Sequence, residues 1–145
     1  MRVAIENIRA LMADACRAAA VPEDKIEVVV EHYLGGELRG KSSHGVAKFC
    51  FEARYFAHRE DEPRVVREHG TLAVVDARRE IGPVSADYAV EVALRKVREY
   101  GAGIVGMINT QRYGILAPWS VGRATSTGSG GHCSQGSRVW GLFSR

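Results

Sequence analysis

A short polar segment of the chain combines side chains suited to proton transfer and anion binding. Residues 40–49 read GKSSHGVAKF, with Ser43 and His44 between two glycines and Lys48 one helical turn further on. Histidine exchanges protons near neutral pH because its unperturbed pKa is about 6.5. From the residues alone, a capped helix start with a surface histidine and a solvated lysine is the favoured interpretation. A site that holds a small carboxylate and moves a proton is the alternative that the residues leave open.

A helix must position these side chains, and the sequence predicts one from about Ser43 to His58. Ser43 would cap its free backbone N–H groups, and the same helix start would favour an anion. Apolar residues at helical spacing predict two earlier helices, over residues 4–20 and from Pro22 to about Gly40. The three helices would form a helical subdomain, residues 1–63, which ends in a charged linker.

The apolar pattern changes after the linker. Residues 64–68 and 71–75 predict two short strands around a His69–Gly70 turn. A helix capped by Ser85 or Asp87 would run to Tyr100 and end at Gly101, and the apolar run 103–109 would follow as a buried strand. Helix and strand at this spacing favour a mixed α/β fold, with an α/β segment over residues 64–120.

Residues 121–145 differ from the rest in composition. All 17 acidic residues and 16 of the 20 basic residues lie in the first 100 positions, and the later basic residues are Arg112, Arg123, Arg138 and Arg145. A Gly-, Ser- and Arg-rich segment without acids predicts an aberrant or disordered tail, such as a shifted reading frame would produce. Four scattered arginines also disfavour a nucleic-acid partner.

The cysteines and the hydropathy pattern bear on location. Cys16, Cys50 and Cys133 are odd in number and far apart, which favours free thiols in a reducing cytoplasm. Cys16 and Cys50 lie on apolar helix faces, where packing roles are expected. No long uncharged apolar run predicts a membrane span, and the charged start does not fit a signal peptide. No metal site is expected, because His132 and Cys133 lack a second ligand pair.

Two blocks of the sequence resemble the type-2 malate/L-lactate dehydrogenase family. In GELRGKSSHGVAKF, residues 36–49, the family pattern is matched by Leu38-Arg39-Gly40 and by Ser43-His44-Gly45-Val46. The block GTLAVVDARREIGPVSADYAVEVALRKVREYGAGIVGMINT is similar to the family's next block. Asp76, Gly82, Ala86 and Asn109 fall in register there. The resemblance covers residues 1 to about 120.

The resemblance implies an oxidoreductase that moves hydride between NAD or NADP and a small 2-oxo or 2-hydroxy acid. His44 would protonate the 2-keto oxygen, and Ser43 would help to hold the substrate. Lys48 replaces the family's carboxylate-binding arginine and keeps the charge without the planar fork. Arg112 stands where a second histidine is usual and could bind an anionic substrate or a cofactor phosphate. No cofactor-binding residue is assigned.

The resemblance also implies a non-Rossmann nucleotide-binding domain, of which residues 64–120 would be a part, and a homo-oligomer, most simply a homodimer. Family members are more than twice as long, so the chain is expected to be a truncated member with little turnover. The alternative is a non-catalytic dimerising or partner-binding fragment, because the missing part would leave apolar surface exposed.

Overall fold

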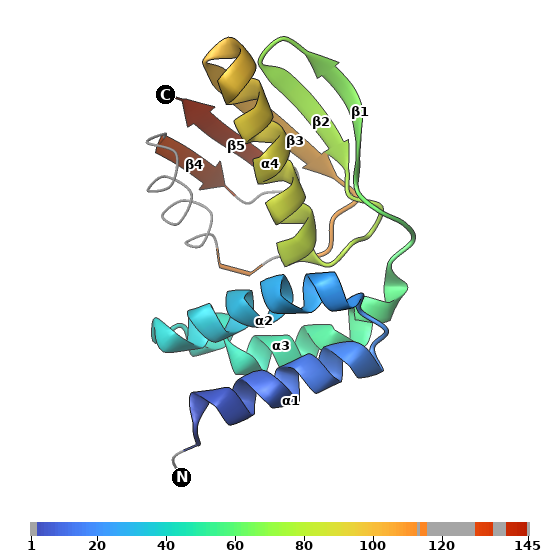
Figure 1. The fold of residues 1–145 in the computed structure, drawn as a ribbon, viewed down its shortest axis with the longest axis vertical. Coiled ribbons are helices and arrows are strands. Elements are labelled where there is room, and N and C mark those ends of the chain that lie inside the picture. The colour runs from blue at the N-terminus through green and yellow to red at the C-terminus, as the bar shows by residue number, and fades with distance from the viewer. Residues whose placement is uncertain (1–2, 113, 116–129, 135–138, 145) are drawn as a thin grey trace. The chain divides into compact units, whose positions relative to one another are not determined.

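The chain folds into two compact units, Met1–Arg59 and Glu60–Arg145. The structure, a computed structural model, describes residues 3–112, 114–115, 130–134 and 139–144, and only the backbone of the last two ranges. The first unit is helical and the second is a mixed α/β unit, which confirms the predicted fold class (Figure 1). The boundary between the units falls at the start of the predicted linker.

Three α-helices form the first unit. They are α1 (Ile5–Ala18), α2 (Glu23–Leu38) and α3 (Val46–Glu52), with the short 3₁₀ helices η1 (Ser42–His44) and η2 (Ala53–His58) on either side of α3. The first two confirm the predicted helices. Tyr33, Phe49 and Phe56 are buried and bring α2, α3 and η2 together. The Phe49 ring centroid lies 5.6 Å from that of Tyr33 and 5.8 Å from that of Phe56, both in edge-to-face geometry, which aromatic rings favour.

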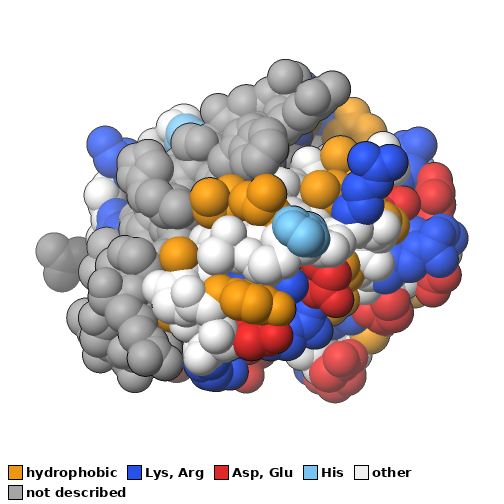
Figure 2. Space-filling view, turned by 90° about the horizontal axis from the view of Figure 1, so that it is seen from above, with side chains coloured by type: hydrophobic (Ala, Val, Ile, Leu, Met, Phe, Trp, Pro, Cys, Tyr) orange, Lys and Arg blue, Asp and Glu red, His pale blue; other side chains and the backbone are white. Residues whose placement is uncertain are grey.

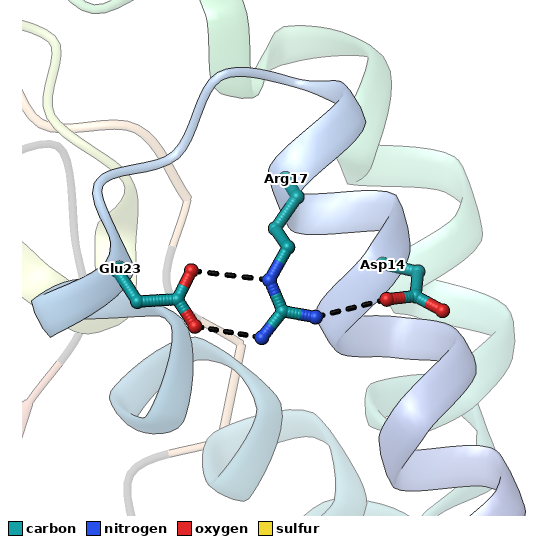
Figure 3. Close-up of polar contacts among 3 residues, drawn as sticks. All are labelled: Asp14, Arg17 and Glu23. Atoms are coloured by element: carbon teal, nitrogen blue, oxygen red, sulfur yellow. Dashed lines mark hydrogen bonds and ion pairs between the residues drawn. The ribbon is translucent and has the colours of Figure 1, made fainter.

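An exposed arginine joins the end of α1 to the start of α2. Arg17 donates to both carboxylate oxygens of Glu23, at 3.1 and 2.6 Å, and to Asp14 at 2.9 Å (Figure 3). The Arg17 hydrogen bonds hold the pKa of the Glu23 carboxyl below its usual range. The planar guanidinium fork matches a carboxylate in this way, so the turn between the two helices has a defined geometry.

The third predicted helix is wrong in its extent. Instead of one helix from Ser43 to His58, the chain forms η1, α3 and η2 in succession. Gly45 has φ −101° and ψ −138°, which is not helical, so the backbone breaks between His44 and Val46. The packing role predicted for Cys50 also fails, because Cys50 is exposed.

The second unit is a mixed sheet covered on one face by a helix (Figure 1). Its elements are β1 (Arg64–His69), β2 (Leu72–Asp76), α4 (Gly82–Tyr100), β3 (Ala102–Ile108), β4 (Gly130–Ser134) and β5 (Val139–Ser144). The strand order is β1-β2-β3-β5-β4, with β2 and β3 parallel and the other pairs antiparallel. The hairpin β1–β2, the helix ending at Gly101 and the strand β3 confirm the sequence prediction.

Small and β-branched side chains pack α4 onto the sheet. The buried core includes Val75, Ala93 and Val105. A Cβ atom on Gly103 would come within 3.0 Å of the Lys96 Cβ, so only glycine allows α4 to lie this close to β3.

The start of α4 differs from the prediction. It begins at Gly82, earlier than the predicted caps Ser85 and Asp87, because Pro83 suits the first turn. The Ser85 hydroxyl instead donates to the Gly82 carbonyl at 3.0 Å and contacts the Thr110 hydroxyl at 2.7 Å.

Two strands lie within the range predicted as an aberrant or disordered tail. The five residues of β4 and the six of β5 pair through their backbones, and β5 pairs with β3. Backbone pairing does not require the apolar period that this range lacks. Residues 121–129, 135–138 and 145 lie outside the described residues. None of the described helices is long and apolar enough to cross a membrane.

Candidate functional site

The segment that carries Ser43 and His44 packs closely against α2, and two glycines make this possible. A Cβ atom on Gly36 would come within 2.9 Å of the His44 carbonyl carbon, and one on Gly45 would come within 2.9 Å of the Glu37 Cα. The Lys41 N–H also donates to the Gly36 carbonyl at 3.0 Å. The position of His44 therefore depends on backbone contact with α2.

A carboxylate from α2 caps α3. The Val46 N–H donates to Glu37 Oε2 at 3.0 Å, and neither η1 nor α3 receives a side-chain cap from its own N-cap residue. The predicted cap by Ser43 is therefore wrong, because the backbone break at Gly45 separates Ser43 from the helix. The predicted anion site at this helix start is not supported, since a protein carboxylate already takes the N–H group.

Ser43 and His44 contact each other directly. The Ser43 Oγ lies 3.0 Å from the His44 Nδ1, with Ser43 exposed and His44 half-buried. The partner of one ring nitrogen decides which nitrogen carries the proton. When Nδ1–H donates to the serine oxygen, the lone pair of the neutral ring is on Nε2, and when the serine hydroxyl donates to Nδ1, the proton is on Nε2.

Lys48 makes an ion pair with a buried glutamate. Its Nζ lies 3.1 Å from Glu52 Oε1, and the Lys48 side chain is 22% exposed. The Tyr33 hydroxyl donates to the other carboxylate oxygen, Oε2, at 2.6 Å. Burial, and then this hydrogen bond, raise the Tyr33 pKa far above its usual range, so the hydroxyl stays protonated and remains a donor. Within the described part of the chain, no hydrogen bond or ion pair joins Lys48 to His44.

Sequence reasoning missed Glu52 and Tyr33 as members of this cluster. The spacing of Lys48 and Glu52, i and i+4 on one helix, was a usable signal for their contact. Tyr33 belongs to α2, and no spacing in the sequence connects it to α3.

A second polar group lies where the parallel strands β2 and β3 end. Asp76 Oδ1 accepts the Arg78 N–H and the Asn109 side-chain amide, each at 3.0 Å. These two hydrogen bonds, the first being the larger cause, hold the Asp76 pKa below its usual range. Asn109, Arg78 and Arg79 have φ of 55°, 50° and 57°, a left-handed conformation that non-glycine residues seldom adopt. Ligands of open α/β sheets bind at the carboxyl ends of parallel strands, so this end of β2 and β3 is where a ligand site is expected.

Arg112 belongs to the second unit, in the segment that follows β3. It is exposed, and the preceding Gln111 donates to the Arg79 carbonyl at 2.7 Å. The structure therefore describes three of the four predicted site residues in one segment of the first unit and the fourth, Arg112, in the second.

A polar cavity of about 330 Å³ lies at the other end of α4. Lys96 is buried there and its Nζ contacts Glu68 Oε2 at 3.0 Å, and Arg95 reaches the same oxygen at 3.1 Å.

Acidic and basic side chains are interleaved on the described part of the face in Figure 2, so that part is not a uniformly basic surface. Among the described residues, no three His, Cys, Asp or Glu side chains form a group that could hold a metal ion.

A family model described as malate/L-lactate dehydrogenase matches residues 3–137. The chain belongs to the malate/L-lactate dehydrogenase family. The match continues past residue 120, where the sequence pattern had ceased to resemble this family. It includes Ser43, His44, Lys48 and Arg112.

Individual relatives agree with this family assignment. The chain is 28% identical over 119 residues to an L-sulfolactate dehydrogenase of Methanocaldococcus jannaschii, covering 79% of this chain and 35% of that protein. A malate dehydrogenase of Pyrococcus horikoshii is 27% identical over 128 residues, covering 83% of this chain and 35% of that protein.

The solved structure of a malate dehydrogenase from Pyrococcus horikoshii OT3 superposes with a TM-score of 0.82 at 26% identity, covering 90% of this chain and 38% of that chain. The chain thus spans about a third of the length of the curated relatives described above.

Proposed function

We propose that the chain carries the substrate-binding and proton-transfer segment of a NAD(P)-dependent dehydrogenase of small 2-hydroxy acids. The observation that carries the proposal is the Ser43–His44 contact of 3.0 Å within the range matched by the dehydrogenase family. A histidine whose ring is oriented by a neighbouring hydroxyl is a suitable general acid and base.

The geometry supports a defined role for each residue. We assign the His44 Nδ1–H as the donor to the Ser43 hydroxyl oxygen, 3.0 Å away, because the acid form of the ring carries a proton on both nitrogens. The imidazolium passes its Nε2 proton to the 2-keto oxygen as the carbonyl is reduced, and the ring becomes neutral with Nδ1 still protonated. The Nε2 lone pair takes the proton back when the 2-hydroxy acid is oxidised. Ser43 thereby acts on the histidine in addition to its expected role of holding substrate.

Lys48 and Arg112 are the proposed anion-binding residues. An ammonium group has three N–H donors, and the Lys48 ammonium lies 3.1 Å from Glu52 Oε1 in an ion pair. Donors beyond this ion pair remain to bind the carboxylate of a 2-oxo acid. Arg112, exposed in the second unit, would bind a further anionic group of the substrate or a cofactor phosphate.

A nicotinamide cofactor is implied by the family, but the start of α4 does not fit its pyrophosphate. Glu80 is 1% exposed, lies just before α4, and its Oε1 accepts the Ile81 N–H at 2.8 Å. A carboxylate at a helix start competes with a bound phosphate for the same N–H groups and repels it. We therefore assign no cofactor-binding residue of this chain and derive no step through the cofactor.

The proposal is tested by oxidation of L-malate, L-lactate and L-sulfolactate with NAD⁺ or NADP⁺. A Ser43→Ala variant should lower kcat about tenfold, the order of one hydrogen bond that orients the acting group. Ser42→Ala is the matched control, because this neighbouring serine is exposed and its side chain has no partner in the described residues. Absence of turnover with all three acids, or equal rates for the two variants, would overturn the proposal.

A second candidate function is partner binding, and an exposed aromatic group favours it. Phe51 and Tyr55 are 46% and 41% exposed, and the Arg54 guanidinium lies 4.1 Å from the Phe51 ring centroid. Aromatic residues and arginine are enriched at protein interfaces. The simplest partner is a second copy of the chain. Sedimentation should show a concentration-dependent homodimer that Phe51→Ser weakens, and a monomer at all concentrations would remove this candidate.

Location in the cytoplasm also remains a proposal. It is supported by Cys16 and Cys50, the two cysteines whose side chains the structure describes, which are both free thiols.

A further inference from the structure

Glu52 occupies a position that is unfavourable for a carboxylate. It lies where α3 passes into η2 and is only 5% exposed. Burial of a carboxylate carries a desolvation penalty. The Tyr33 hydroxyl could donate equally well to the amide oxygen of a glutamine. The core therefore needs an acceptor at this position but does not need a negative charge.

The charge has one described partner of opposite sign, which is Lys48. The ammonium lies 3.1 Å from Glu52 Oε1, and the pair runs from lysine to glutamate along the helix, which is the weaker direction for an i, i+4 ion pair. The contribution of the Lys48–Glu52 ion pair to helix stability therefore does not explain why residue 52 is a carboxylate. The ion pair does restrict a long side chain, since an unpaired lysine at a surface samples many rotamers.

Glu52 is itself held in place from α2. The Tyr33 hydroxyl binds its second oxygen at 2.6 Å, and the Tyr33 ring is packed against Phe49 and Phe56. Tyr33, Glu52 and Lys48 therefore form a chain of contacts that runs from the aromatic core to the Lys48 ammonium, in the first turn of α3.

We infer that Glu52 is a positioning residue that holds the Lys48 ammonium where it binds the substrate carboxylate. The inference rests on the proposed function, because it assigns a purpose to Lys48 in that reaction. Glu52 does not touch the substrate and acts only through Lys48.

Glu52→Gln distinguishes positioning of Lys48 from simple neutralisation of its charge, because the two roles predict opposite changes in KM. Glutamine keeps the size of the side chain and an acceptor for Tyr33 but removes the charge. If Glu52 positions Lys48, the variant raises KM for the 2-hydroxy acid about three- to tenfold, the range for ordering one long side chain, and changes kcat less. If Glu52 merely neutralises Lys48, the site gains positive charge and KM falls.

A double-mutant cycle supplies the control. In a Lys48→Met background the substitution Glu52→Gln should leave KM unchanged, because no ammonium remains to be positioned. An equal rise of KM in both backgrounds would show a general structural effect and would overturn the inference. Circular dichroism and thermal unfolding of each variant establish that the chains compared are folded.

A ligand-independent measurement distinguishes failure of the inference from failure of the proposed function. In ¹H–¹³C spectra an anchored Lys48 has two distinct Cε proton shifts, and Glu52→Gln should merge them. Oxalate serves as a probe that needs no turnover, with a Kd raised three- to tenfold in Glu52→Gln. If oxalate binds and responds in this way without turnover of any 2-hydroxy acid, the proposed function fails and the inference stands. Merged shifts in the wild type, or an oxalate Kd that Glu52→Gln leaves unchanged or lowers, overturn the inference.

Discussion

Two adjacent glycines in α2 should respond in opposite directions to the same substitution. Replacement of glycine by alanine inside a helix stabilises it by about 1 kcal/mol, all else being equal. At Gly35 the new Cβ would meet only Arg39 Nη1 at 2.8 Å, the far end of a flexible side chain that can move away. Gly35→Ala should therefore stabilise the chain by up to about 1 kcal/mol.

At Gly36 the new Cβ would instead meet the backbone of His44, with the carbonyl carbon at 2.9 Å. Overpacking against atoms that cannot move costs about 1–3 kcal/mol, which cancels or exceeds the gain in helix propensity. We expect Gly36→Ala to be neutral to about 2 kcal/mol destabilising, and therefore less stable than Gly35→Ala by about 1–3 kcal/mol.

Urea unfolding of the two variants measures this difference directly. Gly36→Ala should also reduce turnover, because the clash moves His44, whereas Gly35→Ala should leave it unchanged. Equal stabilisation by both alanines would refute the close packing of η1 on α2, and with it the argument that α2 positions His44.

Three further predictions concern caps and titrating groups. Glu37→Ala removes the acceptor for the first N–H of α3 and should cost about 1 kcal/mol in urea unfolding, whereas Glu37→Gln, which keeps an oxygen, should cost less. The lowered pKa of Asp76 means that this carboxylate stabilises the fold above its unfolded pKa and that the stabilisation is lost as pH falls through the folded value. Asn109→Ala should raise that pKa in an NMR titration and move the loss to higher pH, and an unchanged titration would contradict the hydrogen bond. The Glu68 pKa, lowered chiefly by its hydrogen bond to Lys96, should rise in Lys96→Met, and an unaltered value would show that Arg95 alone holds it down.

Much of the fold follows from local sequence patterns. Three features depend only on near neighbours in the chain, and the structure confirms each one. They are the helical periods of α1 and α2, the His69–Gly70 turn and the glycine after α4. The break at Gly45 was not predicted, because its cause is the close approach of α2, which the local sequence does not contain.

The candidate site could be predicted only in part, for the same reason. Ser43 and His44 are adjacent in sequence, so their contact follows from a motif. The cap by Glu37 and the hydrogen bond from Tyr33 to Glu52 join different helices, and tertiary packing alone brings these groups together. The role of Arg112 stays a prediction, because it lies in the other unit.

The central claim is that His44 transfers the proton, and the kcat of His44→Gln tests it most directly. The measurement is the NAD(P)⁺-dependent oxidation of the best of the three 2-hydroxy acids, with wild type and variant at matched folded fraction. Loss of a general acid–base group should lower kcat at least about 100-fold while KM changes little. A kcat within about threefold of wild type would contradict the account, because a group that moves the proton contributes far more than that.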